Sequence, residues 1–133
     1  RRFATWFYVA RLPENAAVVV DGEEMVEARW VSPQIAIEEH ERGTLRLPPP
    51  TVVSLQDLAP PTSVTQILNM VASRVPPYFF PKVCAQAEKN VVMLYPGDAG
   101  YEEANPQATG ERHRGQWSDG VIAYERSYEY SSR

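Results

Sequence analysis

The sequence has one cysteine, two histidines and no long apolar run, and each shortage excludes a class of protein. Cys84 cannot form a disulfide within the chain, so nothing indicates an oxidising compartment. The longest aliphatic run, residues 16–20, is far too short to cross a bilayer. Paired-cysteine zinc spacing, His-Glu-x-x-His and glycine-rich phosphate motifs are all missing. We therefore expect a soluble, cytoplasmic protein with no membrane partner.

Basic residues are also scarce. Lysine and arginine number 13 against 17 acidic residues, which gives a formal charge of -4. A protein that binds the phosphate backbone usually has a basic excess, so we expect no nucleic-acid partner. The composition, 44% hydrophobic and 23% charged, is typical of globular proteins. A chain of 133 residues suffices for one compact domain and hardly for two.

The first residues form an apolar pattern that needs neighbours. Residues 3–12 are rich in aromatic and β-branched types, and both alternating faces are apolar, which predicts a strand covered on both sides. A second strand is predicted at residues 25–31, where apolar and charged residues alternate. One interpretation is that the chain is a piece of something longer that supplies the missing neighbours. The alternative is that the first strand pairs with later ones.

Local signals predict a helix after the second strand. Ser32 and Pro33 form an N-cap followed by a first-turn proline, and Gly43 is a residue typical of helix C-termini, so the helix should end at Arg42. The polar run 38–41, which contains three glutamates and His40, has ligand-type side chains. Such a run more often forms a solvent-exposed helix face.

Prolines divide the middle of the chain. Residues 48–50 are all proline and predict an extended connector, followed by a short helix over residues 51–58. Ser63 and Gln66 form a capping-box pattern that predicts a further helix over residues 64–74.

The last third of the sequence predicts β-structure. Residues 91–95 read as a strand, and residues 111–117 and 121–126 flank a Ser-Asp-Gly turn signal, which predicts a hairpin. The expected fold class is therefore α+β, with a mixed sheet, two or three short helices and a C-terminal β-hairpin.

Two polar groups are candidate functional sites. Glu23, Glu24 and Glu27 surround a turn, and neighbouring carboxylates can bind Mg²⁺; the alternative is an exposed acidic turn. The second group is Arg112-His113-Arg114. On a strand the two arginines share one face and His113 takes the other, so two guanidiniums could bind a phosphate together. The alternative is a surface ion-pair set of these arginines with Glu111 and Asp98.

Two segments resemble the second half of a Nudix hydrolase. They are residues 27–36, which contain Glu27, Trp30 and Ser32-Pro33, and the segment Gly43-Thr-Leu-Arg-Leu-Pro-Pro-Pro-Thr51. The later Pro96-Gly97-Asp98 and the Arg112–Arg114 segment look most like the branch of peroxisomal-type coenzyme A diphosphatases. The resemblance implies a partial α/β/α sandwich. It assigns residues 1–60 to the second half of that fold, and residues 61–133 to a proline-rich helical and hairpin extension in the same compact unit.

The motif that defines the family, Gly-x5-Glu-x7-Arg-Glu-apolar-x-Glu-Glu-x-Gly, is absent. In the family its glutamates hold the metal that activates water, so the intact enzyme is expected to use Mg²⁺ or Mn²⁺ and this chain to bind none. The acidic run before Gly43 lacks the required arginine, because that position is Ala36. No catalytic residue is assigned; Glu24 or Glu27 is a candidate accessory carboxylate.

Two functions remain open. The chain is either the C-terminal portion of a diphosphatase acting on a nucleotide or coenzyme A compound, inactive alone, or a non-catalytic binding or dimerisation module derived from the same fold. An unrelated α+β protein is a third alternative. A half-sheet with unpaired edges tends to complete itself with another chain, so we expect a homodimer, formed for example by strand exchange.

Overall fold

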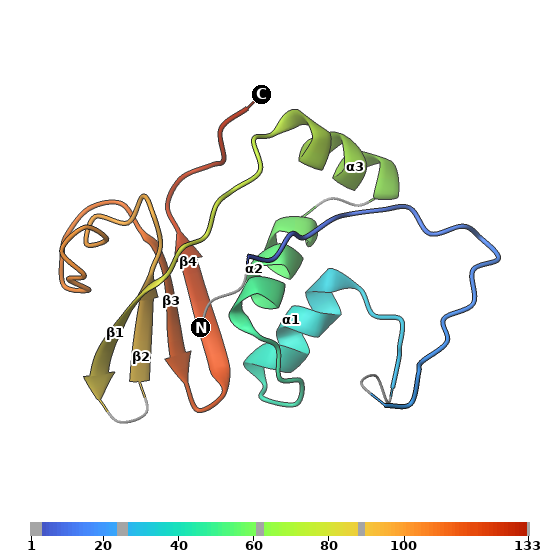
Figure 1. Cartoon of the computed structure of the whole chain (residues 1–133), viewed down its shortest axis with the longest axis horizontal. Helices are drawn as coiled ribbons and strands as arrows, with labels where there is room; N and C mark the ends of the chain where they lie inside the picture. The colour runs from blue at the N-terminus through green and yellow to red at the C-terminus, as the bar shows by residue number, and fades with distance from the viewer. Residues whose placement is uncertain (1–3, 24–26, 61–62, 88–89, 133) are drawn as a thin grey trace.

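The computed structural model describes residues 4–23, 27–60, 63–87 and 90–132. Three helices precede four strands: α1 (Pro33–Glu41), α2 (Pro49–Leu58), α3 (Val64–Ser73), β1 (Lys82–Ala87), β2 (Asn90–Leu94), β3 (His113–Ser118) and β4 (Val121–Arg126). The strands follow sequence order in one sheet, beside which the helices lie (Figure 1). The α+β class and the C-terminal hairpin are confirmed. Every described pairing is antiparallel, which differs from the expected mixed sheet.

Helix α1 has the predicted ends. The Ser32 hydroxyl accepts a hydrogen bond from the Ile35 N–H at 3.3 Å, and Gly43 adopts a φ of +73° just after the C-cap residue Arg42. The prediction of a solvated face is wrong for one residue of this helix, because His40 is only 1% exposed. Its position on the inner side of α1 brings it against the sheet.

Helix α2 begins earlier than predicted. Pro48 is its extended N-cap, and the next two prolines form the first turn instead of a connector. Proline is tolerated there because first-turn N–H groups have no partner within the helix. Helix α3 begins as predicted, with the Ser63 hydroxyl accepting from the Gln66 N–H at 3.2 Å, and ends one residue early. Within the described ranges, no helix has the length and apolar character needed to span a membrane.

The core lies between the first two helices and the sheet. Ala36 and Ile37 of α1 and Val52 and Val53 of α2 are buried, as is Ile122 of β4, against which both helices pack. Helices from residues 1–60 thus pack on a strand from residues 61–133. The division of the chain at residue 60 stays a prediction.

The β3–β4 hairpin turns tightly, as the sequence predicts. Asp119 and Gly120 have φ angles of +49° and +88°, the pattern of a two-residue turn that matches the twist of the strands. Strand β1, by contrast, was not predicted. Its register with β2 shifts between Ala85 and Ala87.

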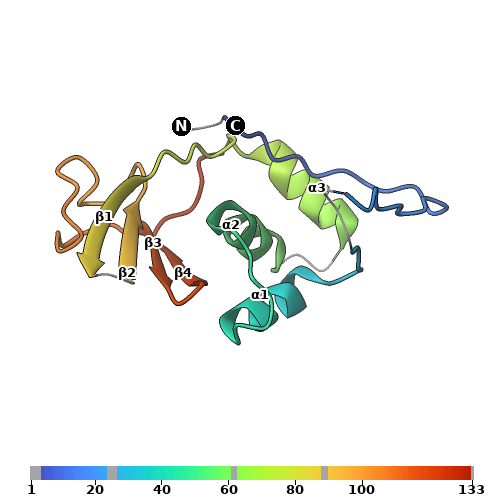
Figure 2. The same cartoon turned by 60° about the horizontal axis from the view of Figure 1, so that its bottom comes forward.

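The strands predicted at residues 3–12 and 25–31 are wrong in their described parts, since residues 4–12 and 27–31 contain no strand. Residues 3 and 25–26 lie outside the described residues. Trp6 is 72% exposed and Trp30 is 78% exposed. Figure 2 shows the N-terminal segment running past α3, away from the sheet. A strand needs a hydrogen-bonded neighbour, and no described residue pairs with these segments.

Candidate functional site

Two segments that the sequence singles out meet at one end of the sheet. Strand β2 leads into the Pro96–Asp98 turn, and β3 begins at His113. Leu94 pairs with Arg114, and the Tyr95 N–H donates to the His113 carbonyl at 2.8 Å. The long loop over residues 99–110 connects the two segments and folds back beside the sheet (Figure 1).

Asp98 is the anchor of this loop. Its buried carboxylate accepts hydrogen bonds from Arg114 Nε at 2.7 Å and Nη2 at 2.6 Å, a bidentate pair. It also accepts from the backbone N–H groups of His113 and Gly100, both at 2.9 Å. Burial alone would raise the pKa of Asp98, but the bonds from Arg114, His113 and Gly100 lower that pKa overall. The carboxylate therefore stays ionised.

The two arginines of the candidate phosphate site have different environments. The third nitrogen of Arg114, Nη1, donates to the Pro106 carbonyl at 2.7 Å, so all three guanidinium nitrogens are engaged. Arg112 Nη1 donates to the Ala108 carbonyl at 2.6 Å, and the side chain is half-buried. No carboxylate of the described residues forms an ion pair with Arg112. Both side chains reach the same loop, as strand alternation predicts.

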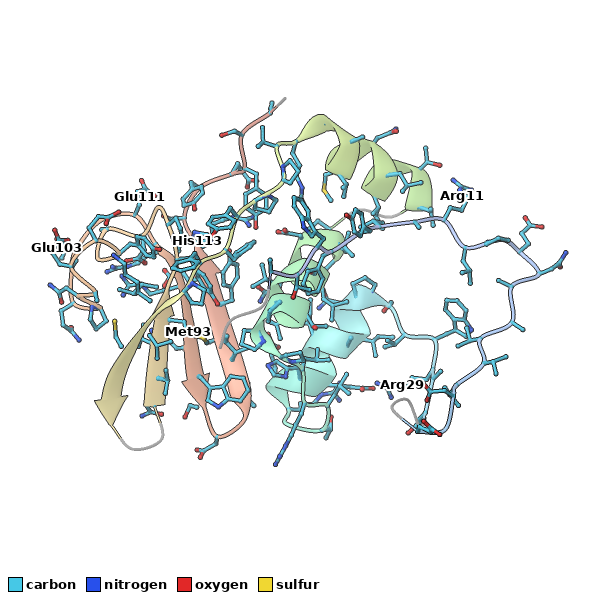
Figure 3. All side chains as sticks on the ribbon, in the orientation of Figure 1. Arg11, Arg29, Met93, Glu103, Glu111 and His113 are labelled. Atoms are coloured by element: carbon cyan, nitrogen blue, oxygen red, sulfur yellow. The ribbon has the colours of Figure 1, made fainter. Side chains whose placement is uncertain are left out.

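His113 lies on the opposite face and is 2% exposed. Its Nδ1 is 2.7 Å from the Pro96 carbonyl and 2.6 Å from the Tyr128 hydroxyl. Four aromatic rings lie with centroids 5.1–5.8 Å from the imidazole: Phe79, Tyr95, Tyr124 and Tyr128. Figure 3 shows His113 at the upper part of the sheet, with Glu103 and Glu111 toward the loop. Burial lowers the pKa of His113.

The phosphate-binding role of Arg112, His113 and Arg114 stays a prediction. The geometry favours Arg112 as the residue with guanidinium hydrogens left for a ligand. The alternative ion-pair set is present in part, since Arg114 pairs with Asp98, whereas Glu111 accepts from the Ser127 hydroxyl.

The acidic candidates that the structure describes, Glu23 and Glu27, do not belong to a metal-binding group. Glu24 lies outside the described residues, and Glu27 is exposed on an extended segment. Among the residues that the structure describes, no group of three or more histidine, cysteine or carboxylate side chains could hold a metal ion. The described residues therefore do not fit the divalent ion that the resemblance implies for the intact enzyme.

A second charged cluster was not predicted. Asp57 of α2 forms ion pairs with Arg126 at 3.2 Å and with Arg74 at 3.4 Å. The two guanidinium carbons lie 3.7 Å and 4.8 Å from the centroid of the Tyr130 ring. The cluster joins residues from three distant parts of the sequence, so no local spacing could have indicated it.

A small cavity lies beside these groups. Its volume is about 160 Å³, and it is lined by residues 75–78, Pro96, His113 and residues 128–131. The residues that close it therefore come from the segment after α3, the turn after β2, strand β3 and the C-terminal segment.

Comparison with known proteins identifies relatives. No family model matches the chain. No solved structure matches it. It is 30% identical over 115 residues to the acyl-coenzyme A diphosphatase NUDT19 of Xenopus laevis, which covers 84% of this chain and 30% of that protein. It is 27% identical over 110 residues to a Caenorhabditis elegans protein named "Putative nudix hydrolase 7", which covers 79% of this chain and 35% of that protein. The chain thus spans about a third of the length of these relatives, and this protein is related to the Nudix hydrolases.

Proposed function

We propose that this chain is the carboxy-terminal part of a Nudix hydrolase that cleaves a diphosphate in a nucleoside diphosphate or coenzyme A compound. The similarity to an acyl-coenzyme A diphosphatase over 84% of the chain supports the proposal. The family's metal-binding helix then lies on a segment outside residues 1–133, and the chain alone has no turnover. A cytoplasmic location stays a prediction.

The acidic residues support this separation of the metal centre from the chain. The Nudix motif is absent from the sequence, and the described residues contain no cluster of ligand-type side chains. Mg²⁺ or Mn²⁺ is held by carboxylates grouped closely enough to share one ion. Glu27 has no such companion among the described residues, and in the proposed enzyme it is at most an accessory carboxylate.

The exposed side chains of the N-terminal segment support the proposal that another chain or segment covers it. Trp6, Tyr8 and Trp30 are each more than 70% exposed, and Val19 is 82% exposed. We infer that these side chains contact another chain or segment, since exposed apolar patches usually mark such contacts. A neighbouring strand would cover residues 4–12 and give them the β-structure that their sequence predicts. Without it, a second copy of this chain is the available partner, which favours a homodimer.

Arg112 is the proposed contact for a substrate phosphate. Its guanidinium is tethered at one nitrogen to the Ala108 carbonyl, which leaves the other donors for an anion. Arg114 supports Arg112 by fixing the loop through Asp98, and His113 fixes the start of β3. The loop is therefore held rigid before any ligand arrives.

The test compares two proteins. One is the isolated 133-residue chain, and the other is the same chain joined to the segment encoded upstream in its reading frame. Hydrolysis of acyl-coenzyme A and of ADP-ribose is followed by chromatography with and without Mg²⁺. We expect Mg²⁺-dependent turnover only in the joined protein, abolished by a glutamate-to-glutamine change in its Nudix motif.

Other outcomes overturn the proposal. Turnover by the isolated chain that is lost in Glu27→Gln would place the metal on this chain. Binding of the compounds without turnover in either protein would instead support the non-catalytic module. Glu14→Gln, an exposed change in the same N-terminal region, is the matched control.

A further inference from the structure

The C-terminal residues 127–132, called the strap here, return from β4 to the end of α3. The Val75 N–H donates to the Ser131 carbonyl at 3.0 Å, and Arg74 forms an isolated antiparallel bridge with Ser132. Figure 1 shows this segment rising from β4 toward the chain that follows α3. Residues 128–131 of the strap and residues 75–78 both line the cavity described above. The cavity is partly open to solvent, and displacement of the strap would remove a further part of its wall.

His113 holds the strap through Tyr128. The Tyr128 hydroxyl donates to the Pro96 carbonyl at 3.1 Å and lies 2.6 Å from His113 Nδ1, which is itself 2.7 Å from the same carbonyl. Because a carbonyl only accepts, His113 carries its proton on Nδ1. The other ring nitrogen, Nε2, then holds a lone pair. It is buried and has no hydrogen-bond partner among the described residues.

Among the described residues, no charged group near His113 is placed to accept a hydrogen bond from a proton on Nε2. From the turn after β2, the Asp98 carboxylate is already committed to Arg114 and to backbone N–H groups. From β4, Arg126 adds positive charge, and Asp57 of α2 is engaged by Arg126.

The remaining titratable neighbours of His113 are neutral phenols and one exposed acid. Tyr95 of β2 and Tyr124 of β4 present rings to the imidazole, and burial raises the pKa of both, that of Tyr95 to about 12. Tyr128 of the strap is likewise neutral. Glu129 of the strap lines the cavity and is exposed to solvent. An imidazolium at this place would thus be buried with no acceptor for its Nε2–H.

We propose that the strap is a pH-sensitive closure, held by neutral His113 through Tyr128 and released when His113 takes a proton on Nε2. His113 already lines the cavity, so the charged ring gains hydration when the strap moves away and the contact of Nδ1 with Tyr128 is lost. The direction follows from linkage. The pKa of His113 is lowered in the folded protein, so below about pH 6.5 the open or unfolded form binds more protons. Closure is therefore complete above that pH and is lost as the pH falls.

Amide hydrogen exchange of the full chain tests the closure. The Val75 N–H reports on the strap, and the N–H groups of β2 and β3 report on the sheet. Protection factors are measured by NMR at pH 7.5 and pH 5.5 after correction for intrinsic exchange. We expect the protection factor of the Val75 N–H to be about tenfold lower at pH 5.5 than at pH 7.5. Each pH unit below the pKa of His113 in the open or unfolded form changes the equilibrium constant for closure by up to that factor. The protection factors of the β2 and β3 amides should stay unchanged.

Two variants make the test specific. His113→Asn keeps a donor near Pro96 but cannot titrate, so the pH dependence of Val75 protection should disappear. If that variant does not fold, Tyr128→Phe replaces it and should show low Val75 protection at both pH values. Glu129→Gln, which removes the exposed acid of the strap, should leave the Val75 response in place. Three results would overturn the proposal: an equal fall of Val75 protection in His113→Asn, no fall in the wild type, or an equal loss of protection at the amides of the sheet.

Discussion

Nε2 of His40 accepts a hydrogen bond from the Ile122 N–H at 3.0 Å, which ties α1 to the outermost strand of the sheet. Among the described residues, no strand pairs with the outer edge of β4, so its outward N–H groups need other partners. The second imidazole nitrogen lies 3.1 Å from the Leu45 carbonyl, and the same ring therefore also holds the chain that leads into α2. One buried side chain connects both helices to the sheet.

Replacement of His40 by alanine should destabilise the protein by roughly 2–4 kcal/mol. The change leaves the buried Ile122 N–H without an acceptor and creates a void beside α1. Urea unfolding followed by circular dichroism measures the change in the free energy of unfolding. Arg42→Ala is the control, because that side chain is 65% exposed and its loss should stay within about 0.5 kcal/mol. Equal losses in the two variants would contradict the role of His40.

Features set by neighbouring residues could be predicted from the sequence. Ser32 and Ser63 cap their helices through bonds that span three residues, and Asp119-Gly120 turns the hairpin through its own φ angles. Each of these depends on local backbone chemistry alone. The α+β class follows from the same signals.

Features that depend on distant residues could not be predicted. His40 lies in a run of charged residues, and only the packing of α1 on β4 explains its burial. Asp57 and Arg126 meet across 69 positions of sequence. The first apolar segment has the composition of a strand, but composition does not supply the neighbour that a strand requires. At the candidate site, the spacing placed Arg112 and Arg114 on one face but could not show that Asp98 saturates Arg114.

Asp98→Asn should destabilise the protein by about 3–5 kcal/mol at pH 7, because it leaves the buried guanidinium of Arg114 without its counter-charge. The effect depends on pH. Since the pKa of Asp98 is lowered in the folded protein, its contribution is present above about pH 4 and is lost as the pH falls through the folded value. The difference in unfolding free energy between Asp98→Asn and the wild type should therefore be larger at pH 7 than at pH 3.

Glu103→Gln is the matched control for Asp98→Asn, since Glu103 is exposed on the same loop. It should unfold like the wild type at both pH values. A difference between Asp98→Asn and the wild type that persists unchanged at pH 3 would show that the charge of Asp98 is not what stabilises the loop.

Arg112→Ala should weaken the binding of a diphosphate ligand by about tenfold, the loss expected when one charged hydrogen-bond donor is removed. NMR titration of the joined protein with ADP gives the affinity, and circular dichroism confirms that the fold is retained. Arg42→Ala removes an exposed positive charge elsewhere and should change affinity by less than about twofold. Unchanged affinity in Arg112→Ala would assign its guanidinium to the loop alone, through the Ala108 carbonyl.

Trp6→Ser should reduce self-association of the isolated chain. Trp6 is 72% exposed, and an indole buried at an interface removes some 150–250 Å² from water at about 25 cal/mol per Å². Sedimentation velocity over a range of concentrations measures the dimer fraction, which should fall in Trp6→Ser. Val83→Ser is the control, because Val83 is an equally apolar residue, 63% exposed, on β1 of the sheet.

The same comparison locates the interface and separates its two interpretations. If Val83→Ser dissociates the dimer and Trp6→Ser does not, the exposed edge of the sheet is the contact surface, and the N-terminal segment is not. If Trp6→Ser acts as expected, the upstream segment should compete for the same surface. The joined protein should then be monomeric at concentrations where the isolated chain is dimeric, because an attached segment binds at a far higher effective concentration than a second copy in solution.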